Sequence, residues 1–102
     1  MANYTLGLGA ENDLVEIGRY TARTWGIEQA RDYLGKLHEH FNDLGTRGAH
    51  PKPAFPHRAD ILRSRCQHHV IFFVITRDRH ALILAVFHEA MDLLARLQSR
   101  LQ

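Results

Sequence analysis

The chain has 102 residues, of which 45% are hydrophobic and 24% charged, and this composition excludes a disordered tail. The length suits one domain covering residues 1–102. A single cysteine, Cys66, excludes an internal disulfide and is typical of a reducing compartment.

Charge is distributed unevenly along the chain. Residues 1–46 carry seven acidic and four basic side chains (net −3), whereas residues 47–102 carry nine basic and four acidic ones (net +5). A basic second half favours an acidic partner, which is either a protein segment or a nucleic acid. Charge alone does not choose between the two.

The N-terminal residues and the apolar runs indicate the compartment. Residues 1–4 lack a basic start, and no apolar stretch of signal-peptide length follows them. The longest apolar run, 70–75, is far shorter than the roughly 20 residues that a membrane span needs. We therefore expect a cytoplasmic protein without membrane contact.

Two helices are predicted in the first half, after a short strand at 4–8. The first helix begins near Ala10, and residues spaced three or four apart form one face: Leu14, Ile17, Thr21 and Trp25. Gly26 ends it. The second helix, 27–44, has a regular apolar face and is followed by Gly45. Two apolar-striped helices joined at one glycine imply a helical hairpin.

Strands are predicted in the second half. Residues 45–57 contain all three prolines and are expected to form a loop. Three strand-like runs follow, joined by short polar connections: 60–66, 69–76 and 81–87. Sequential antiparallel pairing is the simplest topology. Helical spacing returns from Glu89. The expected fold class is α+β, with an N-terminal strand and an α-helical hairpin packed on an antiparallel β-sheet, and a C-terminal helix.

The central strand is apolar on both faces. In 69–76, Phe72 and Val74 point to one face and the alternate residues point to the other. The hairpin can cover only one face, so two alternatives remain for the second. Either the C-terminal helix covers it fully, or an apolar patch stays exposed, edged by Arg63 and Arg65. A patch of that kind is typical of a protein-binding surface.

Short motifs also occur in a specific order along residues 4–97. They are Asp13-Leu14, Trp25-Gly26, Tyr33-Leu34, the run from His69 to Phe73, and Val86-Phe87-His88 with Met91-Asp92-Leu93. In this order they resemble the first helix, the turn, the second helix, the central strand and the tail of ParE toxins, in the ParE/RelE superfamily. The resemblance implies the toxin of a bacterial type II toxin–antitoxin pair.

The resemblance also implies partners. ParE-like toxins are thought to inhibit DNA gyrase, to block replication and so to arrest growth, and a ParD-like antitoxin wraps and neutralises the toxin. We therefore expect a hetero-oligomer of four or more chains, and no direct DNA binding by the toxin alone. The predicted antitoxin-binding residues form the patch described above: Arg63, Arg65, Phe72 and Val74.

The alternative is a RelE-like endoribonuclease that cuts mRNA on the ribosome. Such chemistry needs a base, an acid and cations that stabilise the charge on phosphorus. The candidate set in this chain is Arg63, Arg77 and His88. Because the chain has no tyrosine after Tyr33 and few lysines, we expect a protein that binds other proteins and is not an enzyme.

No metal or cofactor is expected. His38 and His40 lie two residues apart on a predicted helix and point to different faces. The histidines and the one cysteine do not have the spacing of a zinc site. Basic residues within 47–69 suit either phosphates or an acidic antitoxin.

Overall fold

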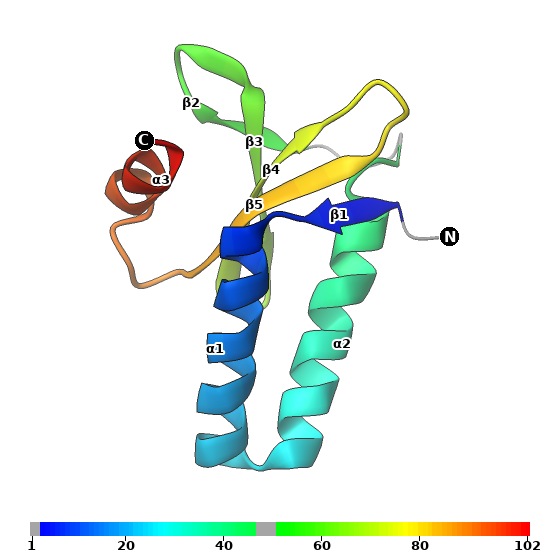
Figure 1. Cartoon of the computed structure of the whole chain (residues 1–102), viewed down its shortest axis with the longest axis vertical. Helices are drawn as coiled ribbons and strands as arrows, with labels where there is room; N and C mark the ends of the chain where they lie inside the picture. Colours follow the sequence, from blue (N-terminus) through cyan, green and yellow to red (C-terminus); the bar gives the residue numbers. More distant parts are fainter. Residues whose placement is uncertain (1–2, 47–50) are drawn as a thin grey trace.

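The computed structural model describes residues 3–46 and 51–102 (Figure 1). The elements in chain order are β1 (Tyr4–Leu6), α1 (Leu8–Trp25), α2 (Ile27–Asp43), β2 (Lys52–Phe55), β3 (Arg58–Cys66), β4 (His69–Ile75), β5 (Ala81–His88) and α3 (Leu93–Leu101). The strands form one sheet in the order β1-β5-β4-β3-β2. The α1–α2 hairpin packs on one face of this sheet, and α3 packs on the other. The predicted fold class is confirmed.

The hairpin turns at a single residue. Gly26 has φ 98° and ψ 164°, a conformation that favours glycine. Its N–H donates to the carbonyl oxygen of Ala22, and its own carbonyl accepts the N–H of Ala30, so one residue ends α1 and begins α2. The predicted stop at this glycine is confirmed. The hairpin side of the core consists of Ala10, Leu14, Leu37, Phe41 and Leu44, packed on Ile71, Phe73, Ala81, Ile83 and Val86.

The sheet is mixed. Strands β3, β4 and β5 pair antiparallel in sequence, as predicted. Strand β1 instead pairs parallel to β5, with Tyr4 opposite Ala81 and Leu6 opposite Ile83. A parallel pair joins segments that are distant in the chain, so a local pattern gives no sign of it. The first strand is also shorter than 4–8, because α1 begins at Leu8.

The predicted loop 45–57 contains a strand, which is a correction. Strand β2 pairs antiparallel with β3, and the register shifts between Pro53 and Phe55. Pro53 is tolerated because β2 is an edge strand, where a missing N–H is least costly. Ala54 and Phe55 are 5% exposed, so burial holds this segment on the sheet. Strand β3 accordingly begins at Arg58 rather than residue 60. Residues 47–50 of the loop lie outside the described residues.

Helix α3 begins later than residue 89, which is a second correction. The Asp92 carboxylate accepts the Ala95 N–H at 3.5 Å and caps the helix at Leu93. Residues before Asp92 form a turn, in which the Met91 N–H donates to the His88 carbonyl. The cap therefore shortens the predicted helix by about one turn.

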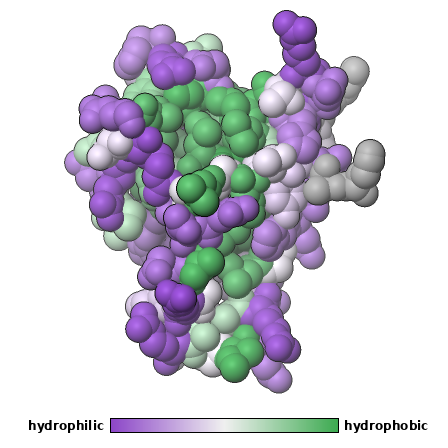
Figure 2. Space-filling model, viewed as in Figure 1, coloured by the Kyte–Doolittle hydropathy of each residue, from purple (hydrophilic) through white to green (hydrophobic). Residues whose placement is uncertain are grey.

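The second face of the sheet, opposite the hairpin, is covered in part. Leu97 of α3 is fully buried against this face, where Phe72 is also fully buried. Val74, Leu84 and Leu93 at its border are only half-buried. Figure 2 shows apolar residues gathered on the surface beside α3. The outcome lies between the two alternatives, because α3 covers the centre of the face and leaves its border accessible.

Candidate functional site

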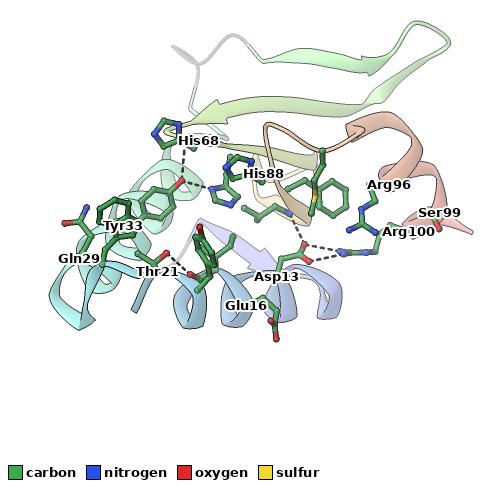
Figure 3. Close-up of a pocket in the computed structure, with 17 residues that line it drawn as sticks. Asp13, Glu16, Thr21, Gln29, Tyr33, His68, His88, Arg96, Ser99 and Arg100 are labelled. Atoms are coloured by element: carbon green, nitrogen blue, oxygen red, sulfur yellow. Dashed lines mark hydrogen bonds and ion pairs between the residues drawn. The ribbon is translucent and has the colours of Figure 1, made fainter. Parts of the chain in front are cut away.

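A groove of about 1150 Å³ lies between α1 and α3 (Figure 3). One wall is α1 with the start of α2, the other is α3 with the turn before it, and the floor is the end of β5 beside the start of β4. Large apolar side chains on its walls are exposed: Tyr20, Trp25 and Met91. The volume exceeds that of most small-molecule sites and suits a peptide segment.

The polar end of the groove is organised around Tyr33 and His69. The Tyr33 Oη lies 2.6 Å from His69 Nδ1 and accepts the backbone N–H of His68 at 3.2 Å. The Tyr33 hydroxyl and His69 Nδ1 therefore share one hydrogen bond, and the tautomer of the imidazole decides which of the two atoms donates. The His88 ring packs edge-on against His69, with centroids 5.3 Å apart.

Protonation of His69 is unfavourable in the folded protein. Burial, with smaller contributions from the His88 and His68 imidazoles, lowers the pKa of His69 to about 4. Burial also raises the pKa of Tyr33. Both groups are therefore neutral near pH 7, and each satisfies the other's hydrogen-bonding atom. This pair joins α2 to β4 and presents a neutral surface to the groove.

The opposite end of the groove contains an ion pair between α1 and α3. The Arg100 guanidinium binds both carboxylate oxygens of Asp13, at 3.0 and 3.2 Å, and donates to the Leu84 carbonyl at 3.1 Å. The Val86 N–H donates to the same carboxylate at 2.9 Å. A Cβ at position 9 would collide with the guanidinium, so Gly9 leaves room for it. These contacts hold α3 against α1.

The predicted antitoxin-binding residues share the second face. Arg63 is opposite Phe72 in the register of β3 and β4, and Phe72 and Val74 alternate along one strand, so all point to the same side. Arg63 is exposed, and Arg65 donates to Glu89 at 2.6 Å. Phe72 is fully buried beneath its neighbours, among them Leu97. The arginines and Val74 thus form the accessible part of this set.

The candidate ribonuclease residues do not converge. His69 pairs with His88 at one end of β4 and β5, and Ile75 pairs with Ala81 at the other. The seven residues of β4 span about 20 Å, at roughly 3.3 Å per residue. Arg77, which lies beyond Ile75, is therefore about 20 Å from His88. One phosphate cannot contact both side chains.

The comparisons with known proteins are consistent with this geometry. A family model described as the ParE toxin of the type II toxin–antitoxin system, parDE, matches residues 4–93. Toxin ParE from Escherichia coli is 40% identical over 103 residues, which cover 100% of this chain and 99% of the relative. The chain belongs to the ParE toxin family. Toxin ParE1 from Caulobacter vibrioides is 30% identical over 97 residues, covering 95% of this chain and 99% of that toxin.

A solved structure, described as a chromosomal ParDE TA system from P. aeruginosa, has the same fold. Its TM-score is 0.66 at 14% sequence identity, and the match covers 86% of this chain and 96% of the other. As a ParE toxin, the chain therefore has the fold and the family that its ordered motifs implied.

Two features of this ParE toxin bear on metals and membranes. Within residues 3–46 and 51–102, His, Cys, Asp and Glu side chains form no group of three or more that could hold a metal ion. Among the same described residues, no helix has the length and apolar character to cross a membrane. His38 and His40 instead hydrogen-bond Tyr4 and Ser64, respectively.

Sequence reasoning missed the residues that shape the groove. Asp13 was recognised only within the Asp13-Leu14 motif, yet it binds Arg100, which is 87 positions away in the chain. Tyr33 was identified only as a family landmark, and its bond to His69 spans 36 positions. The one sequence signal that could have indicated a role for Asp13 and Tyr33 in the groove is that each is a polar residue next to apolar positions of a helix.

Proposed function

We propose that this chain is a cytoplasmic toxin, folded as one domain over residues 1–102, that arrests growth by inhibiting DNA gyrase. A ParD-like antitoxin neutralises it by wrapping around it in a hetero-oligomer of four or more chains. Family membership supports the pairing with an antitoxin, since the family description includes parDE. The relatives' names support the toxin role.

The second face carries the proposal for the antitoxin. Arg63 is exposed beside the half-buried Val74, and Arg63 has no ion-pair partner within the described part of the chain. An acidic antitoxin segment supplies that partner while it covers the apolar border of the face. Arg65 joins the contact by exchanging Glu89 for an antitoxin carboxylate. Phe72 lies beneath Leu97, so it contacts the antitoxin only when α3 moves away from the sheet.

The toxin acts by binding rather than by catalysis. The separation of Arg77 from His88 supports this, because a phosphoryl-transfer site needs its cations and its acid–base groups within reach of one phosphate. The Tyr33–His69 pair is neutral and satisfied by mutual hydrogen bonding, which suits a structural role. The exposed apolar and arginine surfaces suit protein partners.

Expression in a bacterial host tests the target. Inducing the chain should arrest growth, produce cleaved DNA and an SOS response, and leave mRNA intact. Arg77→Ala should arrest growth as strongly as the wild type. Ribosome-dependent mRNA cleavage that Arg77→Ala abolishes would instead establish the ribonuclease alternative and contradict the proposal.

A charge reversal tests the antitoxin contact. Arg63→Glu should weaken binding of the antitoxin encoded beside the toxin by about tenfold or more, because like charges then meet. Lys36→Glu, which changes an exposed residue on α2 paired with Asp32, is the matched control and should bind normally. Equal affinities for the wild type and Arg63→Glu would contradict the proposed interface.

A further inference from the structure

The hairpin tip, residues 19–31, projects beyond the sheet (Figure 1). Only Thr21 and Ala30 in this segment are buried. The large apolar side chains at the tip are strongly exposed: Tyr20 at 62%, Trp25 at 70% and Ile27 at 64%. The sequence pattern had placed Trp25 and Ile27 on the core-facing stripes. They are exposed because both helices extend past the end of the sheet, so the tip is free for other contacts.

The composition of the tip is that of an interface centre. Tryptophan, tyrosine and arginine are the residues most enriched among those that contribute most to protein–protein binding. Trp25 and Ile27 flank Gly26, whose φ of 98° holds the turn in one tight conformation. A rigid turn that presents exposed aromatic and aliphatic side chains loses little conformational entropy on binding. Side chains that are exposed to this extent contribute little to the core of this chain.

Charge at the tip specifies the chemistry of its partner. Residues 19–31 contain three arginines and one glutamate, net +2, although residues 1–46 as a whole are net −3. Arg19 pairs with Glu16 at 3.5 Å. Arg23 and Arg31 have no ion-pair partner within residues 3–46 and 51–102. The complementary surface is an apolar pocket with carboxylates on its rim.

The tip is also separate from the proposed antitoxin surface. The molecule measures 39 Å along its longest axis, and the tip lies at one end of that axis, with β2 toward the other (Figure 1). Arg63 is opposite Lys52 of β2 in the sheet register, so this part of the antitoxin surface lies toward that other end, whereas Arg65, opposite Val70, lies nearer the groove. Tyr20 and Trp25 additionally border the groove, so the tip continues an apolar-lined hollow.

We propose that the toxin binds the folded protein that it inhibits through the hairpin tip. Trp25 inserts into an apolar pocket of that protein, and Arg23 and Arg31 face acidic residues on the rim of the pocket. This inference rests on the proposed toxin function and deepens it by assigning a target-binding surface distinct from the antitoxin surface. A toxin with two separate surfaces contacts its target and its antitoxin through different residues.

The experiment compares Trp25→Ala with Leu8→Ala. Leu8 is 76% exposed and lies at the opposite end of α1, so its variant removes a similarly exposed apolar side chain away from the tip. Purified DNA gyrase is the probe for binding, and growth arrest after induction is the cellular readout. Trp25→Ala should bind gyrase at least thirty-fold more weakly, which corresponds to about 2 kcal/mol. Trp25→Ala should keep the urea midpoint and the antitoxin affinity of the wild type. Leu8→Ala should keep both of these properties as well as the gyrase affinity and the growth arrest of the wild type.

A second variant tests the charges. Arg23→Glu combined with Arg31→Glu should slow association with gyrase about tenfold and reverse its dependence on salt, since attraction to the acidic rim becomes repulsion that salt screens. Normal association of this double variant would contradict the acidic rim.

Other outcomes overturn the inference, and each one indicates what the tip binds instead or which assumption failed. Full growth arrest by Trp25→Ala would show that the tip does not bind the target. Loss of antitoxin affinity in Trp25→Ala would assign the tip to the antitoxin instead. A wild-type dimer that Trp25→Ala converts to monomer in sedimentation would assign the tip to a second copy of the chain. A wild type that causes no growth arrest would overturn the proposed function, and this inference with it, whereas an inert tip in an active toxin overturns the inference alone.

Discussion

Acid should destabilise this protein through His69, a residue that is 9% exposed and whose imidazole is hydrogen-bonded to Tyr33. Burial, together with the neighbouring imidazoles of His88 and His68, lowers the pKa of His69 to about 4 from the ordinary 6.5. Well above pH 6.5, His69 is neutral in both the folded and unfolded states, and its contribution to stability is constant.

Below the ordinary pKa, the unfolded chain binds the proton while the folded chain does not. The free energy of unfolding therefore falls as the pH falls, and the loss is complete below the folded pKa of about 4. Because one pKa unit corresponds to about 1.4 kcal/mol, the loss between pH 7 and pH 5 is about 2 kcal/mol. The full loss is about 3 kcal/mol.

The variant His69→Asn isolates this effect, because an amide retains a hydrogen-bonding atom near Nδ1 but does not titrate. Urea unfolding followed by circular dichroism should show that the wild type loses about 2 kcal/mol more than the variant between pH 7 and pH 5. His57→Asn, which replaces an exposed histidine, should keep the pH dependence of the wild type. Equal losses in the wild type and His69→Asn would refute the assignment.

Four further substitutions, in three experiments, test the fold. Leu97→Ala should lower the free energy of unfolding by about 2–5 kcal/mol in urea titrations, because a fully buried side chain leaves a cavity; a loss below about 1 kcal/mol would contradict the packing of α3. Asp13→Ala and Arg100→Ala should show a coupling of about 1–3 kcal/mol in a double-mutant cycle, whereas additive losses would contradict the ion pair. Gly26→Ala should cost about 1 kcal/mol by the same titration, because alanine disfavours a φ of 98°; unchanged stability would show that the turn is not constrained.

The hairpin and the central strands could be predicted because their signals are local. The helical stripe that includes Leu14, Leu37 and Phe41 is buried at these positions, and Gly26 ends the first helix where its conformation is required. The continuous apolar run of β4 likewise predicts a strand that is covered on both faces. In each case the residues that form the element also carry its pattern.

The remaining features depend on contacts between distant residues. β2 forms from a segment rich in proline because Ala54 and Phe55 find a core on the second face, which a local pattern cannot reveal. β1 pairs with β5 across most of the chain. The stripe from α1 into α2 also gave no sign that the sheet ends before Trp25, so exposure at the tip had to come from the structure. The groove also depends on contacts between distant residues, such as the ion pair of Asp13 with Arg100.

The hairpin uses different residues for folding and for binding. Residues of α2 anchor it to the sheet through imidazole–hydroxyl bonds, such as Tyr33 to His69 at 2.6 Å and His40 to Ser64 at 2.8 Å. Burial lowers the pKa of His40, so burial favours the neutral ring at this position too. Tyr20 on the groove side of α1 is 62% exposed, so its substitution changes stability little. Because the anchoring residues and the exposed residues are separate, the binding surface of this toxin can change by mutation while the fold that presents it is retained.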